Sequence, residues 1–333
     1  MTAQSLRQNG ISFFLGAGAS MDMGFPSGTK LKSQIAHDLQ RPDDSPLGSM
    51  MLQTHPESRG KIQAFAHDLG ECEEASIDEF LFHREEYREI GRLAVWLYIL
   101  AAEKSALEPE KDVTQFWLYQ FLDRFFEAIP HSKHLIRSKD EAFLHGLAIH
   151  TLNYDRLAEY AISTWINTRF PELDLHQNNF ATSLNPDGSI VSHPHGALGP
   201  LFGADAVPFG SEPPMDPQIL RKLASRLRFW FEPNNRPRAH DITNRMVELR
   251  GVHVVTGFGY HPEISNRFRL LMNADANVER VIATSSEDCR ERAEKWLQKT
   301  YAQNGIELHH LEDGATCRSA AEALFSERKR TTQ

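Results

Sequence analysis

Short apolar runs recur along the chain and have the length typical of buried strands. The first, Ile11–Leu15, leads directly into a glycine-rich turn, Gly16–Ser20, as expected at the end of a strand in a parallel sheet. Five later runs have the same character: Leu147–Thr151, Ile190–Ser192, Val252–Thr256, Val278–Thr284 and Ile306–His309. These runs predict the strands of one sheet.

Segments of helical character separate most of the predicted strands. They are Asp155–Arg169, Pro217–Phe231, His261–Met272, Glu287–Gln303 and Ser319–Arg328. This alternation predicts an α/β fold with a doubly wound, mostly parallel sheet and helices on both of its faces. Ligands of such folds bind beyond the carboxyl ends of the strands, so the residues that follow each strand are the first candidates for a functional site.

The segment between the first two strands has a different pattern. A helix is expected to begin near Ser27, whereas Arg41–Gly60 is rich in Pro, Gly, Ser and Asp and is expected to form a loop. Ser76 and Glu79 make a capping-box pair, and apolar residues then keep helical spacing as far as Ala101. One long amphipathic helix is therefore predicted from this point.

A further helix is marked by Trp117 and the aromatic residues that follow it at helical spacing, and Pro130 is expected to end it. No strand is expected between these helices. We therefore predict an all-helical insertion, residues 41–145, between the two parts of one ligand-binding domain, residues 1–40 and 146–333.

Composition indicates a compact folded protein that does not coat polyanions. Hydrophobic residues make up 41% of the chain and charged residues 24%, which excludes a disordered or collagen-like chain. The formal net charge of −9 argues against direct binding of nucleic acid or of an anionic membrane. We expect neither partner.

Cysteine usage and hydropathy favour a reducing compartment. Cys72, Cys289 and Cys317 lie far apart without a CxxC pair, so neither a disulfide framework nor a structural zinc site is expected. The longest strongly apolar run, Leu93–Ala102, has about half the length of a membrane span. The first ten residues lack the apolar core of a signal peptide, so a cytoplasmic location is expected.

The glycine turn after the first strand is the first candidate site. Two glycines in Gly16–Ser20 allow a ligand to approach the backbone closely, and a helix N-terminus beyond them would offer amides to a phosphate. A Rossmann dehydrogenase fingerprint would need glycine where Met21 stands, and a P-loop would need Gly-Lys-Ser/Thr, which is absent. A tight turn without a ligand is the alternative interpretation.

Three further segments follow predicted strands, and each also has an ordinary structural interpretation. The asparagine or aspartate of Thr151–Asp155 could cap the next helix. His193 and His195 could ligate a metal, but no companion Cys/His cluster lies nearby, and a histidine beside a glycine turn is more often structural. Gly257–Tyr260 has the character of a turn. Because all these segments lie at predicted carboxyl ends of strands, we expect them to face one crevice.

The first part of the chain resembles the sirtuin-like NAD-binding family. Phe14–Ser20, followed by Gly24–Ser27, is similar to the family's opening motif, which wraps the pyrophosphate of the dinucleotide. Ser76–Leu81 is similar to a helical segment common in bacterial sirtuin-like proteins. The resemblance implies a sirtuin-like variant of the Rossmann fold.

The later motifs continue the resemblance in family order. Thr151–Asp155 resembles the Thr-x-Asn-Tyr/Ile-Asp motif, His195-Gly196 the His-Gly of the catalytic loop, and Val255–Tyr260 the late glycine motif. Two departures stand out. The four-cysteine zinc module of sirtuin deacylases is missing, and Gly259 replaces a serine that is frequent in the late motif.

The resemblance to zinc-free bacterial members implies an NAD+ glycohydrolase that releases nicotinamide and ADP-ribose and depletes NAD+ in anti-phage defence by abortive infection. It implies NAD+ as substrate and no metal. The implied NAD-binding residues are Gly16, Ala17, Gly18, Ser20, Gly257 and Gly259, and the implied catalytic residues are Asn153, His195 and Asp155. Asn153 would orient water or the ribose hydroxyls, and Asp155 would hold the ribose or stabilise positive charge. His195 would act as general base, because an unperturbed imidazole titrates near neutral pH.

Two alternatives stay open at this point. The first is NAD-dependent protein deacylation or ADP-ribosyl transfer, and the second is a non-catalytic subunit that senses NAD or another nucleotide. A hydrolase that consumes NAD+ has to be controlled, so a regulatory or sensor protein is expected as a partner. Homo- or hetero-oligomerisation is also expected from the family.

Overall fold

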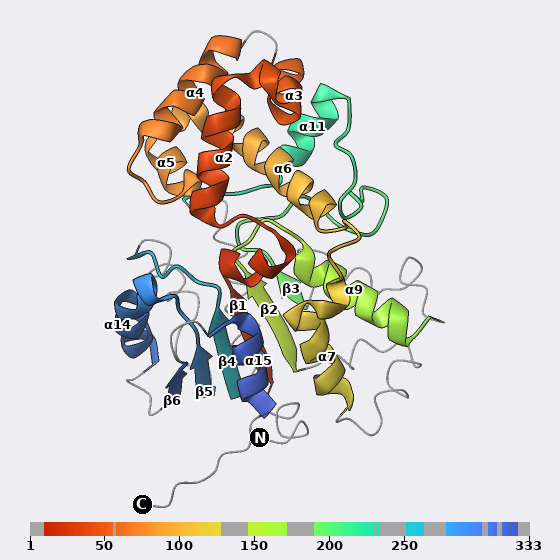
Figure 1. Ribbon diagram of the computed structural model, residues 1–333, viewed down its shortest axis with the longest axis vertical. Helices are drawn as coiled ribbons and strands as arrows, with labels where there is room; N and C mark the ends of the chain where they lie inside the picture. The colour runs from red at the N-terminus through yellow and green to blue at the C-terminus, as the bar shows by residue number, and fades with distance from the viewer. Residues whose placement is uncertain are drawn as a thin grey trace, which may run out of the picture.

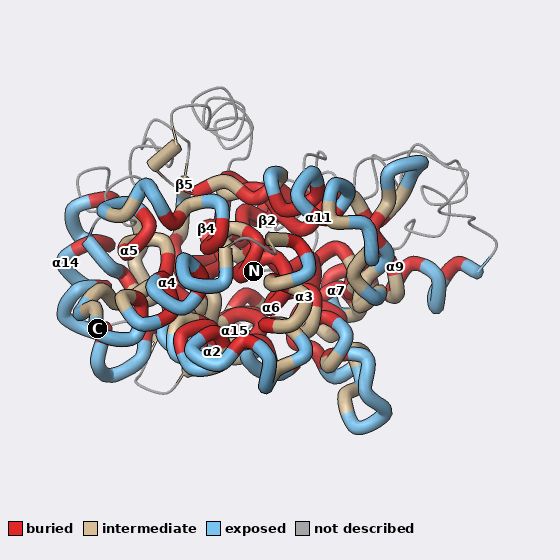
Figure 2. Tube along the Cα trace, turned by 90° about the horizontal axis from the view of Figure 1, so that it is seen from above, coloured by how far each residue is buried: buried red, intermediate tan, exposed pale blue. Residues whose placement is uncertain are grey.

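The structure describes residues 10–55, 58–127, 146–171, 190–229, 231–232, 251–262, 278–301, 306–311 and 315–325. It is a computed structural model (Figure 1) in which a parallel sheet with flanking helices lies below a separate group of helices. The buried positions follow the strands and the helix faces turned toward them, and the exposed positions lie at the periphery (Figure 2).

Among the described residues, one parallel sheet has six strands in the order β3-β2-β1-β4-β5-β6. The strands are β1 (Ile11–Leu15), β2 (Leu147–Thr151), β3 (Val191–Ser192), β4 (Gly251–Thr256), β5 (Val278–Ala283) and β6 (Glu307–His310). The chain moves from β1 to β2 and β3 on one side and then crosses to β4 on the other. The predicted fold class, a doubly wound parallel α/β sheet of Rossmann-like order, is confirmed.

The register of the central strands aligns their carboxyl ends. Leu15, the last residue of β1, pairs with Thr151 at the end of β2 and with Thr256 at the end of β4. The segments that follow these three strands therefore start at one level, at the point where the strand order reverses. This is where a crevice forms in doubly wound sheets.

Helices cover both faces of the sheet. One face carries α7 (Trp117–Glu127), α9 (Leu157–Arg169) and α15 (Cys317–Phe325), and the other carries α14 (Arg290–Tyr301). Phe13 packs in the core with the first group, and its neighbour Phe14 packs with α14. Because the sheet is buried on both faces, all five residues of β1 are buried and all except Ser12 are apolar.

A second group of helices lies beyond the carboxyl ends of the strands (Figure 1). This helical lobe consists of α2 (Gly28–Gln40), α3 (Pro46–Thr54), α4 (Arg59–Glu71), α5 (Ile77–His83), α6 (Arg88–Ser105) and α11 (Pro217–Ala224). It has a core of its own, in which α2 packs on α4 and α11 packs on α3 and α6. The helix α7 follows the lobe in sequence but packs on α9 over the sheet.

The expected loop at Arg41–Gly60 is wrong, because this segment contains α3 and the start of α4. Its Ser and Pro residues start a helix. Ser45 is the N-cap of α3, its Oγ accepts a hydrogen bond from the Gly48 amide at 2.9 Å, and Pro46 occupies the first turn. Serine and proline at these positions favour a helix start as well as a loop, and the two possibilities cannot be told apart by composition alone.

The single long helix predicted from Ser76 to Ala101 is also wrong. Ser76 caps α5 as expected, with the Glu79 amide 3.2 Å from its Oγ, but the helix stops at Arg84 and a short 3-10 turn leads into α6. The break folds α5 back onto α6. There Leu81 packs so closely on Gly91 that a Cβ at Gly91 would collide with it.

Of two other predicted helices, one is shorter than expected and the other lies mostly outside the described residues. The helix predicted at Pro217–Phe231 ends at Ala224 as α11. The helix predicted at His261–Met272 lies outside the described residues from position 263 onward, and the stop at Pro130 also lies outside them. No helix in the described part of the chain is both long and apolar enough to cross a membrane.

Candidate functional site

The turns after β1 and β4 pack against each other through their backbones. The Gly16 amide donates to Thr256 O and the Gly18 amide donates to Gly257 O, both at 3.0 Å. Gly257 has a φ of +70°, and a Cβ there would overlap the Ala19 amide nitrogen and lie 2.9 Å from Gly16 O. The close approach of two chain segments at the strand-order switch therefore requires these glycines.

This packing changes what the first turn can offer to a ligand. The expected helix N-terminus does not follow the glycines directly, because two short 3-10 turns intervene and α2 begins only at Gly28. The amides of Ala19 and Ser20 donate to carbonyl groups within the turn. The phosphate-binding role of Gly16–Ser20 stays a prediction, and most of the turn's amides are already bonded to the protein.

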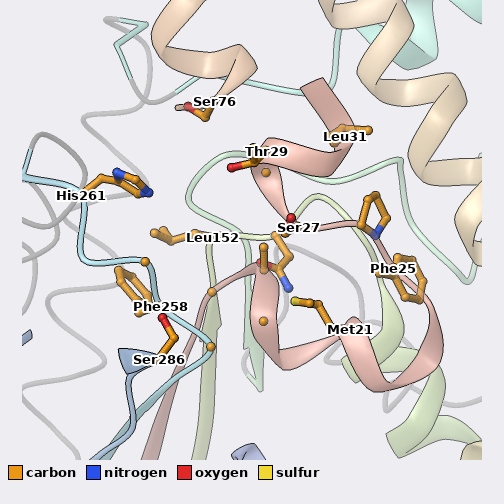
Figure 3. A pocket seen from close by; sticks show the side chains of 18 of the residues that line it. Met21, Phe25, Ser27, Thr29, Leu31, Ser76, Leu152, Phe258, His261 and Ser286 are labelled. Carbon is orange, nitrogen blue, oxygen red and sulfur yellow. The ribbon is translucent and has the colours of Figure 1, made fainter. Parts of the chain in front are cut away.

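A pocket of about 710 Å³ lies between the carboxyl ends of the strands and the helical lobe, within the range of small-molecule and cofactor sites. The predicted residues that line it are Gly16, Ala17, Gly18, Asn153, Asp155, His195, Gly257 and Gly259. Ser20 lies buried behind the lining, 4% exposed. In Figure 3, Ser27 and Thr29 of the α2 start and Ser76 border the same space as Phe258 and Ser286 from the β4 and β5 ends.

A hydrogen-bonded chain connects Asn153, Ser20 and Asp155 at the floor of this pocket. The Ser20 hydroxyl donates to Asp155 Oδ1 at 3.1 Å and accepts from Asn153 Nδ2 at 3.2 Å. A hydroxyl has one proton, so a serine that donates to a carboxylate must accept from the amide. The chain thus fixes the orientation of the Asn153 amide, and among the described residues its Oδ1 atom has no partner.

Asp155 is buried at 6% exposure and has two roles at once. Its Oδ1 atom also accepts from the Leu157 amide at 3.1 Å, at the first residue of α9, so the helix-capping alternative holds beside the contact with Ser20. Burial raises the pKa of Asp155 to about 6, and the nearby Glu103 adds to the increase. The hydrogen bonds from Leu157 and Ser20 and the charge of His193 limit this increase, so the carboxyl group is mostly ionised above about pH 6.

Replacing Asp155 by asparagine is expected to stabilise the protein at pH 7. The pKa of Asp155 is raised in the folded state from its ordinary value of 3.8, so the folded protein binds this proton more tightly than the unfolded chain. The stabilisation that comes from this tighter proton binding is complete below about pH 4, and it is lost as the pH rises through about 6. Asparagine keeps the acceptor and removes the charge, which should increase the free energy of unfolding by roughly 1–3 kcal/mol at pH 7.

Thermal unfolding at pH 7.5 and pH 4.5 tests this expectation. The gain from Asp155→Asn should be largest at the higher pH, whereas Asp44→Asn, which changes an exposed carboxylate, should have little effect at either pH. An equal gain from Asp155→Asn at both pH values would contradict a buried, partly ionised carboxyl group.

His195 reaches the pocket from the loop after β3. The backbone around it is well held: its carbonyl accepts from the Arg228 amide at 2.7 Å, and the Gly196 amide donates to His193 O at 2.9 Å. The His195 ring lies beside that of Tyr154, with 6.2 Å between the ring centroids. The structure therefore brings Asn153, Asp155 and His195 together at one pocket.

Asp78 is a pocket residue that sequence reasoning did not select. It lies in the first turn of α5, accepts a hydrogen bond from Tyr154 OH, and burial raises its pKa to about 6. It connects the helical lobe with the segment after β2. Thr284–Ser286 and Thr316 also line the pocket. The signal for Thr284–Ser286 was available, since polar residues directly after a predicted strand lie at the ligand edge of the sheet.

The described lining carries four carboxylates and neither lysine nor arginine. The carboxylates belong to Asp22, Asp78, Asp155 and Asp288. Such a lining favours a ligand with positive charge in part of its structure. Besides the imidazoles of His195 and His261, the described lining can meet phosphate only through amides and hydroxyls. Within this part of the chain, no group of three or more His, Cys, Asp or Glu side chains is arranged to hold a metal ion.

No protein-family model matches this chain, and no curated protein matches it in sequence. The function is therefore argued from the geometry of the pocket and from the motifs in the sequence.

Proposed function

We propose that the protein is an NAD+ glycohydrolase, which cleaves the bond between nicotinamide and ribose and releases nicotinamide and ADP-ribose. The observation that carries the proposal is the chain from Asn153 through Ser20 to Asp155, which faces the same pocket as His195 at the strand-order switch. The sequence motifs that resemble the sirtuin-like family contain these four side chains, in the family's order along the chain.

The chemistry requires little from the protein at the leaving group. The nicotinamide ring of NAD+ is cationic, so the electron pair of the breaking C–N bond neutralises it and nicotinamide leaves without a proton from an acid. The ribose carbon gains oxocarbenium character. Water then adds its oxygen to that carbon and loses a proton, so the sum of the reaction is NAD+ and water to nicotinamide, ADP-ribose and a proton.

Three side chains fit the demands of this reaction. Asn153 Oδ1 would accept a hydrogen bond from the attacking water or from a ribose hydroxyl, and its orientation is set before the substrate binds. Asp155, ionised above about pH 6, would stabilise the positive charge that develops on the ribose. His195 would remove a proton from the water or from a ribose hydroxyl.

The charge of the pocket supports a substrate with a cationic end. Asp155 is linked to Asn153 through Ser20, and Asp78 bonds Tyr154, whose ring lies beside that of His195, so both carboxyl groups lie near the residues that would contact the nicotinamide ring and its ribose. The start of α2 gives the diphosphate a second source of amides beside the glycine turn. Ser27 caps this helix, and Gly28 and Thr29 in its first turn line the pocket.

On this proposal the protein would act in anti-phage defence by depleting the NAD+ of an infected cell. Constant activity would harm the host, so control by a partner protein or by self-assembly is part of the proposal. Deacylation of proteins and ADP-ribosyl transfer are weaker candidates, since the chain lacks the four-cysteine module of sirtuin deacylases.

The proposal predicts that His195→Ala lowers NAD+ hydrolysis by at least about 10²-fold, the usual contribution of a general base. NAD+, nicotinamide and ADP-ribose should be quantified by chromatography with the purified protein, and NAD+ also in cells that express it, so that a partner present in cells can act. His37→Ala is the matched control, because this histidine lies on α2 with its side chain exposed to solvent. It should hydrolyse NAD+ like the unaltered protein.

The products distinguish the alternatives. Free ADP-ribose in a 1:1 ratio with nicotinamide supports hydrolysis, whereas acetyl-ADP-ribose or a modified protein would indicate deacylation or transfer. Tight NAD+ binding by calorimetry, with NAD+ stable both in vitro and in cells, would indicate that the protein is a sensing module and not an enzyme. Equal turnover by His195→Ala and the unaltered protein would remove His195 from the mechanism.

A further inference from the structure

His193 lies two residues before His195 but contacts different groups. It follows β3 directly and is buried at 2% exposure. Its Nδ1 atom is 2.8 Å from the backbone carbonyl of Asn153, and its Nε2 atom is 2.8 Å from Glu159 Oε1 on α9. The side chains of His193 and Glu159 are both fully buried.

The two partners determine where the protons of this ring lie. A backbone carbonyl can only accept, so Nδ1 carries a proton and donates it to Asn153 O, while Nε2 and Glu159 Oε1 share a hydrogen bond. Burial alone would lower the pKa of His193, but the charge of Glu159 and the bonds to Glu159 and Asn153 outweigh it, and the pKa is raised. The ring is therefore held by hydrogen bonds at both of its nitrogens, and the contact with Glu159 favours its protonated form.

The contact completes the fixation of Asn153. The backbone N–H of Asn153 donates to Thr151 Oγ1 at 3.1 Å, and its backbone carbonyl accepts from His193. Its side-chain Nδ2 donates to Ser20. One local anchor, Thr151, and two anchors that are distant in the sequence, Ser20 and His193, thus hold one residue. The Oδ1 atom is left as the acceptor that a substrate can use.

We propose that His193, paired with Glu159, is a positioning residue that holds Asn153 for reaction with the substrate. This inference rests on the proposed NAD+ hydrolysis and extends it to a pair outside the pocket lining, of which His193 reaches the lining through the backbone carbonyl of Asn153. Misplacement of a reacting group by about 1 Å can lower a rate by about 10²-fold. Loss of the His193 contact should therefore act on turnover and not on substrate affinity.

His193→Gln tests this inference through kinetics. We expect kcat for NAD+ to fall by about 10²-fold with KM changed by less than about threefold, since the pocket lining is intact. Glu159→Gln should lower kcat in the same direction and provides a second variant if the first folds poorly. His253→Gln is the matched control: His253 is an equally buried histidine on β4 that bonds Tyr301, and kcat per folded molecule should stay unchanged.

Nitrogen-15 NMR gives a readout that does not depend on activity. At pH 7.5 the Nδ1 atom of His193 should have the chemical shift of a protonated ring nitrogen, and the Asn153 side-chain amide signals should shift in His193→Gln but not in His253→Gln. An unprotonated Nδ1 atom of His193, unshifted Asn153 signals or an unchanged kcat in His193→Gln would each overturn the inference. If the unaltered protein does not hydrolyse NAD+, the proposed function fails, while the NMR signals still decide whether His193 holds Asn153.

Discussion

Asn153→Ala is expected to lower NAD+ hydrolysis by about 10³-fold or more while the protein stays folded, because the substitution removes both the acceptor for water and its preorganised orientation. The amide is half-buried at the floor of the pocket and contributes little to the hydrophobic core. Ser20 would keep its bond to Asp155, so the local backbone should persist. The effect should fall on kcat, since the rest of the lining is unchanged.

The measurement is a comparison of kcat and KM for NAD+ between the unaltered protein, Asn153→Ala and Asn167→Ala. Asn167 is an exposed asparagine on α9 and should tolerate the change. Circular dichroism and thermal unfolding establish that both variants are folded. Turnover by Asn153→Ala within a few-fold of the unaltered protein would show that the reaction, if present, takes place without this side chain.

Gly257→Ala is expected to destabilise the protein by about 3–5 kcal/mol, a large part of the stability of an ordinary domain. A φ of +70° is unfavourable for alanine, and the new Cβ would overlap the backbone of Ala19, which cannot move without opening the turn after β1. The same turn borders the pocket. Any folded molecules that remain should therefore bind NAD+ poorly.

Chemical denaturation of Gly257→Ala measures this loss, and Gly203→Ala separates its two causes. Gly203 also has a positive φ, of +102°, but a Cβ there would meet nothing within 4 Å. It should cost only the conformational strain, about 1–2 kcal/mol. Equal decreases in the free energy of unfolding for the two variants would mean that the turns after β1 and β4 do not pack as closely as described.

Local patterns were sufficient where the signal lies within one element. The strands of a parallel sheet are buried on both faces, so β1, β2 and β4 are apolar runs that can be recognised one at a time. Ser27 and Ser76 cap α2 and α5 as their sequences indicate, because a cap depends on a residue and the amide three positions later.

Patterns failed where packing between distant segments decides the outcome. Apolar spacing continues through Arg84, yet the helix breaks there so that Phe80 and Tyr87 can stack and pack against Phe65 of α4. The start of α3 looked like a loop because its capping residues are also turn formers. In both cases the deciding contacts come from other helices of the lobe, which a local window does not contain.

The sequence by itself determined the fold class and the positions of the residues that follow each strand, because the hydrophobic pattern of a strand and the glycine content of a turn are local properties. Only the tertiary structure decided the use of the glycines at the strand-order switch and the role of His193. It also decided the orientation of Asn153. Each of these depends on hydrogen bonds or close contacts between segments far apart in the chain, and their partners are known only once the strands are ordered in the sheet.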